Sequence, residues 1–314
     1  MAVALGNRSG LIHCPFLYSL TANWAILRHI MSRITIEFYK PVVVNDDDES
    51  FGDVLGTIAQ MNIPQRIRGA PDPAGIFGLA QNGDDFSGEA ARVRMEDLPR
   101  AVDIATGRFH DLNVRDHEGL SEEIHFLYDA GIDVIAIQRK LHMRASALRD
   151  LISDLAQTQV DFQIILRRDA WERFQQMPLI KKVSFKLARP LDLTGQPLPS
   201  LMRVFQEMDE FNGVSAKVEI SVDRERNRGL NLDSVTQLVR SFRERADDFE
   251  AFSITGAIRD EEGTKPETVD FINGSLQHIE DVERRGRRLD PDGCRLALRR
   301  GIRANRAYLR RYTE

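Results

Sequence analysis

The C-terminal segment, residues 284–314, constrains the fold most, because its pattern is that of one long amphipathic helix. Asp290 has the side chain of an N-cap, Pro291 suits the first helical position, and Asp292 falls in the first turn. At about 100° per residue, one face roughly 120° wide holds eight mostly apolar residues. They are Cys294, Leu298, Gly301, Ile302, Asn305, Tyr308, Leu309 and Tyr312. We expect this face to be buried.

Five arginines occupy a second arc, about 80° wide, beside the apolar face. We call them the arginine row: Arg295, Arg299, Arg303, Arg306 and Arg310. At about 1.5 Å per residue, the row is roughly 22 Å long. The segment 284–314 contains eleven arginines and three acidic residues, a net charge of +8, whereas the whole chain carries −5. The rest of the chain therefore carries −13.

This charge asymmetry has two interpretations. In the first, a row of guanidinium groups contacts the phosphates of nucleic acid, with binding that is independent of base sequence and sensitive to salt. In the second, the basic helix lies against the acidic remainder of the chain or against a partner subunit. The first interpretation makes the arginine row the predicted nucleic-acid-binding site, with DNA favoured over RNA. The second makes the helix a protein-interaction element.

Composition limits the other classes of function. The chain has 314 residues, 42% hydrophobic and 29% charged, which is enough for one large or two medium domains. A pI near 5.9 argues against a generally basic nucleic-acid binder, so any such surface is local. Cys14 and Cys294 support neither a disulfide framework nor a zinc site, which fits the cytoplasm. We expect no cofactor, no metal and no membrane span.

The first thirty residues differ from the rest. A moderately apolar stretch, residues 11–31, is interrupted by polar residues and is a poor signal peptide. Met31 stands directly before the first strand pattern, in which Ile34, Ile36 and Phe38 alternate with polar residues. We expect residues 1–30 to be an extension outside the native core. The alternative is an amphipathic N-terminal helix that docks on a partner.

Further along, strand patterns alternate with hairpin signals and with helices, which predicts an α+β (mixed α/β) fold. We expect short, mostly antiparallel strands, interspersed helices and a long C-terminal helix. The predicted divisions are an α+β domain at 31–118, a mixed α/β domain at 119–285 and the arginine-rich helix at 286–314. Residues 100–119 are polar without a clear period and are predicted to be a loop. The internal helices are predicted at about 49–61, 144–157, 169–176, 199–211 and 232–246.

One hairpin raises an enzymatic hypothesis. Metal-dependent nucleases place an acid on one strand of a hairpin and an (E/Q)-x-K triplet on the next, and Asp129 or Asp133, followed by Gln138 and Lys140, has that order. The carboxylate would bind Mg²⁺ and the lysine would orient hydroxide. Glutamine supplies no charge to a metal, and a turn aspartate beside a strand-ending cation explains the same residues. With no HExxH, P-loop or nucleophile elbow, an enzyme is the less favoured class.

Two stretches resemble an uncharacterised bacterial and prophage family defined only as a domain of unknown function. The first is residues 88–99 (GEAARVRMEDLP), and the second is residues 118–129 (EGLSEEIHFLYD), which lead into the strand 134–138. The later order of elements, with PLIKKVSFKLARP at 178–190, is similar to that of RexA-type phage-exclusion proteins.

The RexA-type resemblance implies a cytoplasmic, homodimeric protein of anti-phage defence that binds DNA and signals to a membrane-protein effector. Combined with the arginine row, it leads us to expect a non-enzymatic protein that contacts nucleic acid through phosphates. The alternatives are a scaffold protein that uses its C-terminal helix and the Mg²⁺-dependent nuclease.

Overall fold

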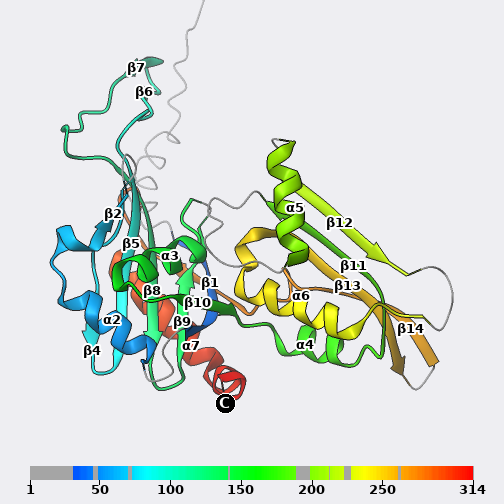
Figure 1. The fold of residues 1–314 in the computed structure, drawn as a ribbon. Helices are drawn as coiled ribbons and strands as arrows, with labels where there is room; N and C mark the ends of the chain where they lie inside the picture. Colours follow the sequence, from blue (N-terminus) through cyan, green and yellow to red (C-terminus); the bar gives the residue numbers. More distant parts are fainter. Residues whose placement is uncertain are drawn as a thin grey trace, which may run out of the picture.

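The computed structural model describes residues 31–44, 49–69, 73–140, 142–188, 199–211, 213–222, 228–260 and 263–313. The predicted extension 1–30 lies outside these ranges. Two antiparallel sheets stand side by side, each with helices packed on it (Figure 1). Within the described part of the chain, no helix combines the length and the apolar character needed to cross a membrane.

The first sheet has the strand order β10-β1-β9-β8-β5-β3-β2, with β15 paired to β1 and β4 paired to β5. All of these pairs are antiparallel. The strands are β1 (Ser32–Val43), β2 (Ile67–Arg68), β3 (Ala74–Ile76), β4 (Ala80–Asn82), β5 (Asp85–Arg94), β8 (Leu120–Asp129), β9 (Val134–Gln138), β10 (Val160–Ile164) and β15 (Gln277–Val282).

Both faces of the first sheet are covered by helices. The helices α2 (Phe51–Gln60) and α3 (Ala145–Ala156) pack on one face, and α7 (Pro291–Thr313) packs on the other (Figure 1). The two cores follow from the alternation of side chains along each strand. On β1, Ile36 and Phe38 belong to the core under α7, whereas Tyr39 belongs to the core under α2 and α3.

The second sheet has the order β12-β11-β13-β14. One face is buried under three helices, and a cluster of phenylalanines fills the space between them and the sheet. The opposite face carries polar pairs such as Lys182 with Glu219 and Thr255 with Thr268. The elements are β11 (Leu179–Ala188), β12 (Ser215–Ser221), β13 (Phe249–Asp260), β14 (Gly263–Asp270), α4 (Arg168–Gln175), α5 (Pro199–Glu210) and α6 (Leu232–Glu244).

The two sheets meet where β10, at the edge of the first sheet, packs against α6 of the second. An antiparallel bridge between Leu166 and Ser275 lies at the same boundary. One hydrophobic core runs continuously from α2 and α3 to the phenylalanine cluster of the second sheet. We call this boundary the seam.

The α+β class, the antiparallel hairpins and the long C-terminal helix are confirmed. Residues 100–119 differ from the predicted loop, because β6 (Ala101–Asp103) and β7 (Arg108–His110) form a small hairpin there. A turn at Thr106 and Gly107 closes it, and its strands are too short to give a periodic pattern. The domain boundary predicted at residue 118 lies just before β8. Because β8 pairs with β5, the first sheet contains strands from both sides of that boundary.

Candidate nucleic-acid interface

The helix α7 is anchored on the first sheet as its sequence predicts. The Asp290 carboxylate accepts a hydrogen bond from the Gly293 amide, and the Cys294 amide donates to the Asp290 carbonyl, so Asp290 caps the helix. Within the predicted apolar face, the following are buried: Cys294, Leu298, Gly301, Ile302 and Leu309. The Tyr308 hydroxyl donates to the Leu166 carbonyl at 2.6 Å, which fixes the far end of the helix.

The arginine row lies along the exposed side of this anchored helix, and its members differ in their partners. Arg295 pairs with Asp292 of its own first turn. Arg306 pairs with Asp129 at the end of β8, where the Asp129 side chain is only 10% exposed. Arg310 also has an interaction. Three of the five arginines of the row therefore already have an interaction within the chain.

The middle of the row is open. Arg299 and Arg303 are exposed, and neither has an ion-pair or hydrogen-bond partner among the residues that the structure describes. Together with Arg306 they line a cavity of about 310 Å³ between α7 and the β4–β5 turn. We call it the α7 cavity. Asp85 and Asp129 line its other side. An anion that enters it would meet three guanidinium groups.

Other arginines of the segment are used within the fold. Arg300, on the other flank of the buried face of α7, pairs with Glu280 of β15 at 3.2 Å, and Arg285 pairs with Asp290 at 2.8 Å. Arg300 and Arg306 therefore pair with carboxylates outside the segment 284–314, as the second interpretation expects, whereas Arg285 pairs with an acidic residue of the segment itself. The second interpretation does not account for Arg299 and Arg303.

The residues of the nuclease hypothesis are not brought together. Asp129 is cross-strand partner to Val134, and Gln138 lies four residues further along β9. At about 3.4 Å per residue this separates Asp129 from Gln138 by about 14 Å, with Lys140 further along the chain. Asp129 is also occupied by Arg306. The described residues contain no group of three or more side chains that could hold a metal ion.

Gln138 and His125 instead belong to a buried polar layer beneath α7. His125 is 1% exposed, and its Nδ1 lies 3.5 Å from a carboxylate oxygen of Glu89. Burial lowers the pKa of His125 to about 4, so the ring is neutral at pH 7. Burial also raises the pKa of Cys294 to about 11, which keeps its thiol protonated and unreactive. This layer supports the helix and offers no nucleophile.

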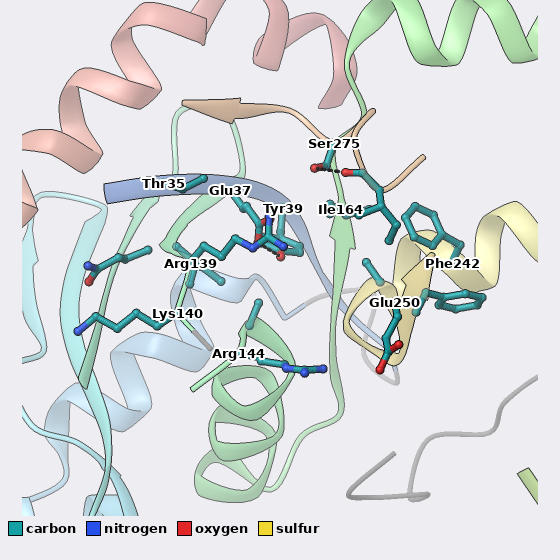
Figure 2. Close-up of a pocket in the computed structure, with 16 residues that line it drawn as sticks. Thr35, Glu37, Tyr39, Arg139, Lys140, Arg144, Ile164, Phe242, Glu250 and Ser275 are labelled. Carbon is teal, nitrogen blue, oxygen red and sulfur yellow. Dashed lines mark hydrogen bonds and ion pairs between the residues drawn. The ribbon is translucent and has the colours of Figure 1, made fainter. Parts of the chain in front are cut away.

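A second cavity, of about 490 Å³, lies at the seam, and we call it the seam cavity. Its walls come from β1, from the stretch between β9 and α3, from α6, and from the start of β13 (Figure 2). The charged or polar lining residues include Glu37, Tyr39, Arg139, Arg144, Glu250 and Ser275. The apolar lining residues include Ile164, Phe242, Phe249 and Ile272.

A hydrogen-bonded network orders one wall of the seam cavity. Glu37 accepts from the Tyr39 hydroxyl at 2.9 Å and from Gln277 at 3.2 Å, and it lies 3.4 Å from Arg139. Gln277 also donates to Ser275. Sequence reasoning missed this site, because Glu37 and Gln277 are 240 residues apart and meet only through the pairing of β1 with β15.

Comparison with curated proteins gives no match. The profile of a family of unknown function, DUF6731, matches residues 88–288, which is more than half of the chain. The matched stretch includes both segments quoted above, and it ends before α7 begins. The chain therefore belongs to the family of unknown function DUF6731.

Proposed function

We propose that this protein binds nucleic acid, with DNA favoured, through phosphate contacts along the arginine row. The observation that carries the proposal is the pair Arg299 and Arg303. These guanidinium groups are one helical turn apart, exposed, and without partners among the described residues, on a helix that is otherwise firmly packed. Arg306, on the next turn, extends the same surface.

The fixed geometry of α7 favours this role. Because the apolar face of α7 is buried on the first sheet, the row is held in one line before any ligand arrives, and less ordering is needed on binding. A guanidinium presents a planar fork of donors to phosphate oxygens and reads no base. The contacts are therefore expected to be independent of sequence and to weaken as counterions compete.

The test measures, by fluorescence anisotropy, how tightly the full chain binds a random DNA duplex at a series of salt concentrations. The affinity of the wild-type protein should fall linearly with salt on a logarithmic plot, with a slope that reports several phosphate contacts. The double variant Arg299→Glu/Arg303→Glu should lose binding at every salt concentration while keeping its thermal unfolding midpoint.

The matched control is Arg287→Glu/Arg288→Glu in the hairpin of β16 (Arg284–Arg285) and β17 (Arg288–Leu289). Both residues are exposed arginines without ion pairs among the described residues, so the total charge changes equally. This control should retain most of the affinity. Equal losses in the two variants would mean that net charge governs binding, and the row would lose its role.

The resemblance to RexA-type proteins supports a finer proposal, that nucleic-acid binding serves anti-phage defence in a homodimer that signals to a membrane-protein effector. A bacterial host carrying the gene and its neighbours should restrict phage plating, and Arg299→Glu/Arg303→Glu should abolish the restriction. Light scattering of the purified chain should give twice the mass of the monomer. Restriction that is unchanged in the variant would separate defence from the arginine row.

A further inference from the structure

The seam cavity shares no lining residue with the arginine row, and its lining combines cationic, apolar and acidic side chains. Two arginines, aromatic and aliphatic residues, and the carboxylates of Glu37 and Glu250 line this one cavity, which opens to solvent. We propose that the seam cavity is a binding site for a nucleoside 5′-phosphate. Its volume of about 490 Å³ falls within the range of about 300–1,000 Å³ that is typical of small-molecule sites.

The phosphate would lie on the side formed by Arg139 and Arg144. Both line the cavity, and Figure 2 shows their side chains pointing toward the side on which Phe242 lies, whereas Lys140 points the other way. The helix α3 begins at Ala145, which also lines the cavity, and its N-cap Arg144 provides no side-chain acceptor for the first turn. Two guanidinium forks and the positive end of a 12-residue helix therefore favour an anion here.

The opposite wall suits a base. Phe249 and Ile272 belong to the apolar lining of the cavity, and a planar ring placed against them would lose part of its contact with water. Phe242 is fully buried and contacts three other phenylalanines, so this wall is rigid. A bare phosphate would leave the partly exposed apolar residues of the lining, Ala246 and Ile272, in contact with water, which argues for a ligand with a ring.

The carboxylates supply acceptors for the hydroxyl and amino groups of a nucleoside. Glu37 is held in position by Tyr39 and Gln277, and its charge is balanced by Arg139. The charge of Glu250 is balanced by Lys186, which lies outside the cavity. Because both carboxylates have cationic partners, they can accept hydrogen bonds without repelling a phosphate on the Arg144 side.

The experiment is isothermal titration calorimetry of the full chain with adenosine, guanosine and uridine 5′-monophosphates as probes. Adenosine and inorganic phosphate are titrated separately. We expect at least one monophosphate to bind about tenfold or more tightly than either fragment, because only the intact probe reaches both walls.

Three variants locate the probe. Arg144→Glu should weaken binding by about tenfold or more through loss of a charge-assisted contact. Ala246→Trp should abolish it, because Ala246 lines the cavity and an indole would fill it. Arg299→Glu/Arg303→Glu should leave it unchanged. Circular dichroism establishes that each variant is folded.

Two results would overturn the proposal. One is that no monophosphate binds more tightly than inorganic phosphate. The other is that binding survives Ala246→Trp but is lost in Arg299→Glu/Arg303→Glu, which would place the probe on α7.

Discussion

The arginine row and the seam cavity are built in opposite ways. The row comes from one helix, within residues 295–310, and its central side chains are open to solvent. The cavity is assembled from residues between Thr35 and Ser275, and buried residues such as Ile164, Phe242 and Ser275 form part of its walls. A helical period is enough to find the first kind of site. The second kind exists only after the strands have paired.

The two regions also differ in their relation to the family. The lining residues from Ile137 to Ser275 lie inside the stretch that the family profile matches, whereas the arginine row lies beyond its end. Binding at the seam would therefore be a property to test in other members of the family. Binding along α7 has to be tested chain by chain.

The largest expected effect is a difference in unfolding free energy between substitutions at the seam cavity and substitutions on the arginine row. Phe242→Ala removes a fully buried ring from the seam wall and from the phenylalanine cluster, which should lower the free energy of unfolding by about 3–5 kcal/mol. Urea unfolding followed by circular dichroism measures it. Arg303→Ala, the matched exposed change on the row, should stay within about 0.5 kcal/mol. A similar loss of unfolding free energy in both variants would contradict the distinction between a buried cavity wall and an exposed row.

The same contrast explains what could be predicted from the sequence. The cap at Asp290, the buried face of α7 and the alternation along β1 depend on neighbours within a few residues, and those predictions are confirmed. The hairpin β6–β7 has strands of three residues each, too short for a period to appear. The nuclease motif requires the acid and the glutamine to lie close together in space. The register of β8 and β9 instead pairs Asp129 with Val134, four positions before Gln138.

The support beneath the row should respond to pH. The pKa of His125 is lowered to about 4 chiefly by burial, with Lys140 and Arg295 acting in the same direction and Glu123 against them. Between its ordinary pKa of 6.5 and about 4, the unfolded chain binds a proton that the folded chain does not. Above pH 6.5 the histidine is neutral in both states, and the free energy of unfolding does not change through His125. Between pH 6.5 and about 4, the free energy of unfolding should fall by about 1.4 kcal/mol for each pH unit.

Urea unfolding at about pH 7 and about pH 5, for wild type and for His125→Gln, measures this effect. The difference between the two proteins isolates the histidine from Glu89, whose pKa is raised by burial and whose contribution has the opposite sign. An equal slope in both proteins would show that His125 is not the titrating group.

A smaller effect distinguishes members of the row itself. Arg306→Ala leaves the Asp129 carboxylate, which is only 10% exposed, without its cationic partner, so the free energy of unfolding should fall by about 1–3 kcal/mol. The half-exposed position of Arg306 places the expectation in the lower part of that range. Because Arg303→Ala breaks no ion pair, its unfolding midpoint in urea should match the wild type. A loss at Arg303 equal to that at Arg306 would show that the middle of the row has a structural partner.

The smallest effect is expected at the mouth of the seam cavity. Arg139 is 54% exposed, and its partner Glu37 keeps the hydrogen bonds from Tyr39 and Gln277 when the guanidinium is removed. Arg139→Ala should therefore cost less than about 1 kcal/mol in unfolding free energy. The same variant should lose most of the thermal stabilisation that a bound nucleoside monophosphate gives the wild type, since stabilisation by a ligand follows its affinity. Arg139→Ala that unfolds markedly earlier without ligand would make the ion pair a structural clamp. A near-neutral change without ligand, combined with a weak response to it, would assign the charge of Arg139 to binding.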